Sequence, residues 1–149
     1  MKTISKIILL CPLLTVFSFA YSQDIKFQRP PLFNTYPNSI PASVPQLQAA
    51  FAVAQGSAVT LNFGDHFSFS GTVIANVQKF PNLHTVLIRS VLLHNTLFSI
   101  SQRTGPDQAV TYVAHIINPG YADGYELARD SSGNYAFNKI KTKDLIQDY

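Results

Sequence analysis

Polar and apolar residues alternate along most of the chain after Gly56, as they do in strands that bury one face of a sheet. Clusters of Gly, Pro, Asn, Asp and Ser, such as Gly105-Pro106-Asp107, separate the alternating segments and are typical of turns. Because these turns are short, neighbouring strands are expected to be antiparallel. The pattern predicts a meander of about seven strands, over residues 59–63, 67–77, 84–93, 97–103, 109–117, 124–129 and 135–140.

Two features depart from this simple alternation. Gly71 lies inside the long second segment, where a glycine indicates a bend or a bulge. Val86-Leu87-Ile88 and Ile116-Ile117 place apolar residues on both faces of their strands, which then need cover on both faces. The natural cover is the one helix that the sequence predicts.

That helix is predicted over residues 44–55. Ser43-Val44-Pro45-Gln46 has the form of a capping box, in which the serine hydroxyl accepts from the Gln46 amide and the glutamine side chain reaches back. Proline is tolerated in the first turn of a helix. Apolar residues follow at helical spacing, and Gly56 is placed to end the helix.

Residues 23–42 are predicted to form a proline-rich extended arm. Pro30, Pro31, Pro37 and Pro41 remove amide donors and bias the residues before them toward extended geometry. The arm is too apolar for a solvated tail and is expected to lie against the domain. Its apolar residues are Ile25, Phe27, Leu32, Phe33, Tyr36 and Ile40.

Residues 1–22 have the pattern of a signal peptide: a basic start, an apolar run over residues 7–17, and a small-x-small site at Ala20-Tyr21-Ser22. Cleavage is expected after Ser22, or alternatively after Ala20. Cys11 does not fit a lipidation site, since Leu10 precedes it. The protein is therefore expected to be secreted or periplasmic, with no transmembrane segment after cleavage and residues 43–149 forming a single domain.

The charge balance argues against a nucleic-acid partner. Loss of Lys2 and Lys6 with the leader leaves nine basic and eight acidic residues, a net charge of +1. Lys139, Lys141 and Lys143 form a loose cluster, interpreted as lysines that protect an edge strand or as a small basic patch. The mature chain would contain no cysteine, which removes disulfides and thiolate metal sites from consideration.

The titratable residues show no local catalytic or metal-binding motif, and neither a metal nor a cofactor is predicted. The four histidines, His66, His84, His94 and His115, lack metal-ligand spacing, and the first and third fall in predicted turns. His84 and His115 would converge only if their strands were neighbours. No Gly-x-Ser-x-Gly elbow is present, and most acidic residues fall in predicted turns.

The most distinctive candidate surface is the segment from Asn118 to Tyr125, which combines two tyrosines with an aspartate and two glycines. Tyrosine provides contact area at a small entropic cost and is common in recognition loops. The candidate ligand-binding residues are Tyr121, Asp123 and Tyr125. The alternative is a structural turn, favoured for Tyr125 because this residue shares strand parity with Leu127.

The stretch from Thr111 to Pro119, followed by Asp123 to Leu127, is similar to sequences in small uncharacterised secreted domains of the Bacteroidota. This resemblance covers residues 57–147 and implies no activity.

Together these observations predict a mainly β, or α+β, fold in which one N-terminal helix packs on an antiparallel barrel or a strongly curved sheet. The expected function is that of an exported, non-enzymatic binding or accessory module for a protein, peptide or glycan. The alternative is a small secreted hydrolase or metal-dependent enzyme whose His and Asp residues assemble only in space.

Overall fold

The computed structural model describes residues 29–145. The predicted leader over residues 1–22, its cleavage site and Cys11 lie outside the described residues. Within them, no helix combines the length and the apolarity that are needed to cross a membrane.

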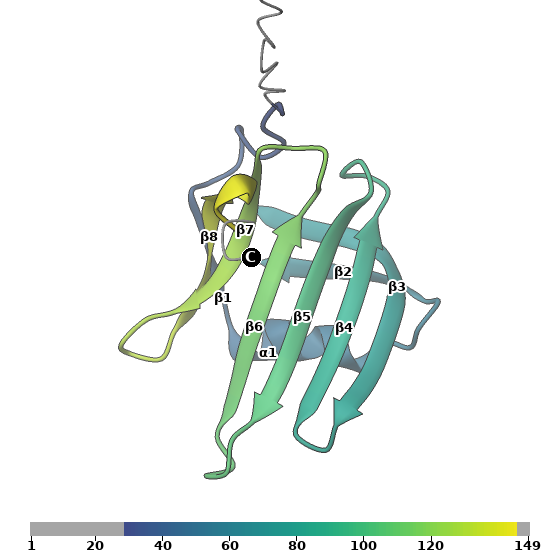
Figure 1. The fold of residues 1–149 in the computed structure, drawn as a ribbon, viewed down its shortest axis with the longest axis vertical. Helices are drawn as coiled ribbons and strands as arrows, with labels where there is room; N and C mark the ends of the chain where they lie inside the picture. The colour runs from purple at the N-terminus through teal and green to yellow at the C-terminus, as the bar shows by residue number, and fades with distance from the viewer. Residues whose placement is uncertain (1–28, 146–149) are drawn as a thin grey trace, which may run out of the picture.

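The fold is mainly β, as predicted, and consists of one antiparallel sheet in the order β1-β8-β7-β6-β5-β4-β3-β2. The sheet curls into a half-barrel (Figure 1). Eight strands form it within residues 29–145, where about seven were predicted. Their bounds are β1 Ser39–Ala42, β2 Ala58–Phe63, β3 Phe67–Phe80, β4 Leu83–Ser90, β5 Thr96–Thr104, β6 Val110–Ile117, β7 Asp123–Arg129 and β8 Tyr135–Lys141.

The strand that the sequence did not predict is β1, which lies inside the predicted extended arm. It pairs with β8, and Pro41 lies opposite Ala136. Proline is tolerated at this position because β1 is an edge strand and forms backbone hydrogen bonds with only one neighbouring strand. β8 is consequently an interior strand, so the interpretation of Lys139 and Lys141 as protection of an exposed edge is wrong, and Lys143 lies past the end of β8.

The helix begins where predicted but ends earlier. α1 spans Val44–Ala49 and continues as a 3₁₀ turn, η1, over Ala50–Ala52. The Gln46 side chain forms its half of the capping box, with its Oε1 accepting from the Ser43 amide at 2.8 Å. At the end of η1, the backbone carbonyls of Phe51, inside this turn, and of Val53, directly after it, accept from the side-chain amide of Asn76 in β3, at 3.3 and 2.8 Å.

This contact with Asn76 gives a physical reason for the early end of the helix, because a side chain from the sheet takes carbonyls that a longer helix would use. Gly56, expected to end the helix, lies four residues past η1. It adopts a positive φ of 87°, and its amide donates to Val73 O at 2.8 Å. It therefore leads into the pairing of β2 with β3.

β3 is a single long strand that pairs with β2 through its first part and with β4 through its second. The predicted irregularity near Gly71 is present as a register shift between Val73 and Ala75. Gly71 also allows a close approach of two strands, since a Cβ at this position would lie 2.4 Å from the carbonyl oxygen of Arg89. The bend lets one strand serve both walls of the half-barrel.

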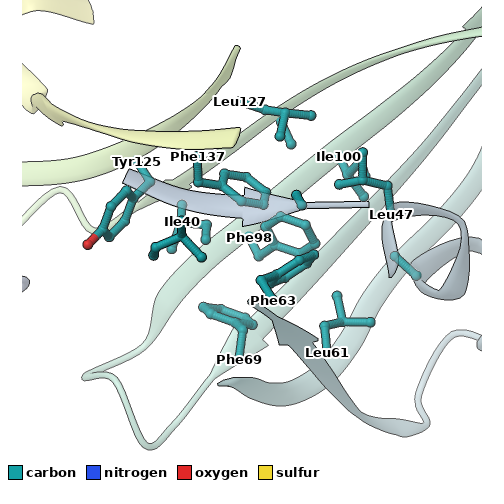
Figure 2. Close-up of a cluster of buried hydrophobic side chains, with 14 of the residues drawn as sticks. Ile40, Leu47, Leu61, Phe63, Phe69, Phe98, Ile100, Tyr125, Leu127 and Phe137 are labelled. Carbon is teal, nitrogen blue, oxygen red and sulfur yellow. The ribbon is translucent and has the colours of Figure 1, made fainter. Parts of the chain in front are cut away.

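The core fills the concave side of the sheet and is rich in phenylalanine. The Phe63 ring lies 5.0 Å from that of Phe137 and 5.9 Å from that of Phe98. Figure 2 shows these rings meeting from three different strands, with Leu47 of α1 at one side. α1 thus covers part of the concave side, and the core residues alternate along the strands as predicted.

The outer face of the sheet carries apolar side chains that no helix of the described residues covers, whereas cover on both faces was expected from the sequence. Leu87 and Ile117 point away from the core and are only half-buried, and Val113 is 56% exposed. Within residues 29–145, the one α-helix lies behind the sheet in Figure 1, on its concave side. The outward side chains of the central strands are therefore not covered by a helix in the described part of the chain.

Candidate functional site

Asp123, a predicted ligand-binding residue, binds the backbone of its own chain. Its carboxylate accepts from the amide of Leu32 at 2.5 Å and from the amide of Phe33 at 2.9 Å. The neighbouring amide of Ala122 donates to Pro30 O at 3.0 Å. Asp123 is buried. These bonds fasten the segment before β1 to the start of β7, and they explain why a carboxylate is placed here.

Tyr125 is also held inside the fold. Its ring has no exposed surface and packs edge-on against Phe33, with the ring centroids 5.1 Å apart. Its hydroxyl donates to Pro37 O at 2.5 Å. Burial, with a smaller contribution from the nearby Asp123 carboxylate, raises the pKa of Tyr125 to about 12. The side chain is a neutral, structural hydrogen-bond donor, consistent with the structural alternative that its strand parity favoured.

Tyr121 is the one of the three predicted residues that keeps part of its surface exposed. Its backbone is fixed, because Tyr121 O accepts from the hydroxyl of Thr142 at 2.8 Å and its amide donates to Asn118 O at 3.0 Å. Its ring lies beside the imidazole of His94, with the two centroids 5.8 Å apart. Tyr121 is thereby linked to the turn between β4 and β5.

That turn, residues 91–95, displays apolar side chains to solvent. Val91 and Leu92 are each 75% exposed. His94 and Asn95 adopt φ angles of 52° and 64°, the left-handed region that non-glycine residues rarely occupy. Because this backbone conformation is unfavourable for non-glycine residues, contacts with the surrounding residues must stabilise the turn.

Three buried polar residues beneath the turn hold it: Ser90, Thr96 and Asn118. Asn118 donates from Nδ2 to His94 O at 2.7 Å, and the hydroxyl of Thr96 donates to Leu93 O. Ser90 accepts from the Leu93 amide at 3.4 Å. Buried polar groups that are hydrogen-bonded in this way fix one conformation of the turn.

We call the surface formed by Val91, Leu92, His94 and Tyr121 the loop end. The β4–β5 and β6–β7 turns that carry it lie together at the top of Figure 1, at the end where the described chain begins. Sequence reasoning found Tyr121 but missed Val91 and Leu92, because it assigned them to the end of a strand over 84–93. The sequence signal that could have located this turn is His94-Asn95, because such residues tolerate the left-handed backbone conformation that tight turns use.

The histidines predicted as possible partners are far apart in the sheet. His84 lies on β4 and His115 on β6, and β5 separates these strands. His84 shares a hydrogen bond of 2.5 Å with Asn76 Oδ1 and lies beside the Phe51 ring. His115 Nε2 lies 3.5 Å from Glu126 Oε1. Within residues 29–145, no three His, Cys, Asp or Glu side chains gather as a metal site would require.

A second polar feature lies under η1. Tyr112 is 5% exposed, and its hydroxyl is the one buried side-chain oxygen or nitrogen without a hydrogen-bond partner among the described residues. Its ring lies beside those of Phe51 and Tyr135. The Tyr112 amide, in contrast, donates to the hydroxyl of Tyr135 at 3.2 Å.

Comparison with protein-family models, curated proteins and solved structures finds no match to this chain.

Proposed function

We propose that this protein is an exported, non-enzymatic binding or accessory module of the bacterial envelope or extracellular space, and that the loop end is its recognition surface. The observation that carries the proposal is the display of Val91 and Leu92, both 75% exposed, on a turn fixed by buried polar residues. Two neighbouring apolar side chains with a purely structural role would be expected to be buried in the core, whereas these two face solvent.

The residues around this pair support the same proposal. Tyr121 and His94 lie side by side next to the turn and add aromatic surface with polar edges. Aromatic anchors among apolar contacts are typical of binding surfaces. Because the Tyr121 backbone and the turn are both hydrogen-bonded, little conformational entropy remains to be lost on binding. A protein, peptide or glycan is the partner class that the sequence led us to expect.

The proposal is tested by photo-crosslinking in cells that export the protein. A photoreactive p-benzoylphenylalanine replaces Leu92 in one variant and Val113 in a matched control. Both positions are exposed and apolar, but Val113 lies on the outer face of β6. We expect adducts of increased mass from the Leu92 position and few from the Val113 position.

Equal adduct yields from the two positions, or adducts from Val113 alone, would move the recognition surface to the sheet and overturn the assignment. Loss of adducts from both positions would argue against a binding module. Circular dichroism of both variants checks that neither probe disturbs the fold.

A further inference from the structure

The strands next to the loop end, and the segments hydrogen-bonded to them, also carry an excess of basic side chains. Arg89 directly precedes the buried Ser90 that holds the turn, and Arg29 directly precedes Pro30, which is bonded to Ala122. Lys141 pairs with Asp123 in the β7–β8 ladder. Lys143 follows Thr142, whose side chain is bonded to Tyr121 O. All four basic side chains are exposed.

The acidic side chains of the same elements are fewer. Asp144 and Glu126 of β7 are exposed, whereas Asp123 is buried and faces the amides of Leu32 and Phe33. The opposite end, with Lys79, Arg103 and Arg129 against Asp107 and Asp130, is closer to balance, and all five are exposed. Four exposed basic side chains against two exposed acidic ones leave an excess of positive charge at the end of the sheet that displays Val91 and Leu92, although the whole mature chain is nearly neutral.

We infer that the loop end docks on an anionic lipid surface, with Val91 and Leu92 entering the interfacial region and the four basic residues facing the headgroups. This inference rests on the proposed function, since it uses the same surface, and it names a partner class that the sequence did not suggest. A protruding apolar tip surrounded by cations matches both the apolar and the anionic layers of such a surface.

The chain contains no tryptophan, which makes a sharp test possible. Leu92→Trp places a single fluorophore at the tip, and Val113→Trp places one on the outer sheet face as a control. The exported protein is mixed with vesicles of phosphatidylglycerol and phosphatidylcholine in equal parts, or of phosphatidylcholine alone. We expect a blue shift of emission only for Leu92→Trp and only with the anionic vesicles.

Vesicle co-flotation measures the contribution of charge. Each basic residue near an anionic surface strengthens binding by about fivefold, so Lys141→Gln/Lys143→Gln should weaken binding by about 25-fold. Lys79→Gln, at the opposite end, should leave binding unchanged. Val91→Ser/Leu92→Ser should abolish the co-flotation, and raised salt should weaken it.

The possible outcomes separate this inference from the proposed function. Adducts to a protein at Leu92 in cells, with neither a blue shift nor co-flotation, would overturn lipid docking and leave the recognition surface in place. An equal blue shift from Val113→Trp would show that the sheet face also touches the lipid, which overturns docking through the loop end and leaves the recognition surface to the crosslinking experiment. Equal binding to neutral vesicles would remove the charge argument and overturn the inference.

Discussion

The hydroxyl of Tyr125 donates to the carbonyl oxygen of Pro37, which lies 88 residues earlier in the chain. This bond and the contacts of Asp123 fix the segment before β1 against β7. Asp123 and Tyr125, two of the candidate ligand-binding residues, therefore hold the N-terminal segment in place, a structural role that the strand parity of Tyr125 had favoured. The recognition surface that we propose lies at the same end of the fold, around Tyr121.

Removal of this hydroxyl alone should weaken the fold. Tyr125→Phe keeps the ring in its packing with Phe33 but leaves Pro37 O without its donor, so we expect a loss of about 1–2 kcal/mol of unfolding free energy. Tyr125→Ala, which also empties the ring's site, should cost about 3–5 kcal/mol. Urea unfolding measures both, and an unchanged midpoint for Tyr125→Phe would show that the bond contributes nothing.

The raised pKa of Tyr125 predicts sensitivity to alkali. Its pKa is about 12 in the fold against 10.0 for a free tyrosine. A phenol with a raised pKa contributes its stabilisation fully below pH 10, and the contribution is lost as the pH rises from 10 toward 12, because the unfolded chain ionises first. Unfolding midpoints measured across this range should fall less steeply in Tyr125→Phe than in the unsubstituted protein. If the unfolding midpoints of the two proteins fell equally steeply with pH, the raised pKa of Tyr125 would be contradicted.

Removal of the unpartnered hydroxyl of Tyr112 should not destabilise the fold, in contrast to removal of the Tyr125 hydroxyl. Tyr112→Phe removes a buried polar group that has no partner, so the unfolding free energy should stay equal or rise by about 1 kcal/mol. Tyr135→Phe is the matched comparison, because it removes the acceptor of the Tyr112 amide and should cost about 1–3 kcal/mol. A destabilised Tyr112→Phe variant would mean that its hydroxyl has a partner in solution.

The bend of β3 depends on Gly71. A methyl group there would lie 2.4 Å from Arg89 O, and the strand backbones cannot separate without breaking their pairing. Gly71→Ala should therefore cost about 1–3 kcal/mol or more, as overpacking does elsewhere. Ser68→Ala, on an exposed position of the same strand, should stay within about 0.5 kcal/mol of the parent. Equal thermal midpoints for both variants would show that the strands adjust freely.

The parts of this fold that sequence predicts well are those set by local pattern. Alternation located the seven strands after Gly56, and the capping box located the start of α1, because both signals come from residues a few positions apart. β1 was missed because Pro41 lies in a proline-rich segment that predicts an extended arm. Its pairing with β8, near the other end of the chain, is not visible in the local sequence. The helix end was missed because Asn76, from a distant strand, takes its carbonyls.

The candidate site shows the same division. Composition pointed to the Tyr121 segment, but not to Val91 and Leu92, which continue an apolar run and read as strand. Their exposure follows from the bonds of Asn118 and Thr96, which turn the chain at His94. Composition also could not distinguish Asp123 and Tyr125, which hold the N-terminal segment, from residues that face solvent.

The most direct test of the recognition surface combines Tyr121→Ala with the photoreactive probe at Leu92. An aromatic anchor of a binding surface typically contributes about 2 kcal/mol or more. We therefore expect the adduct yield from Leu92 to fall strongly, while the urea midpoint stays close to that of the parent, since Tyr121 is bonded mainly through its backbone. An unchanged adduct yield with a lowered midpoint would contradict the account, because Tyr121 would then serve the fold and not the partner.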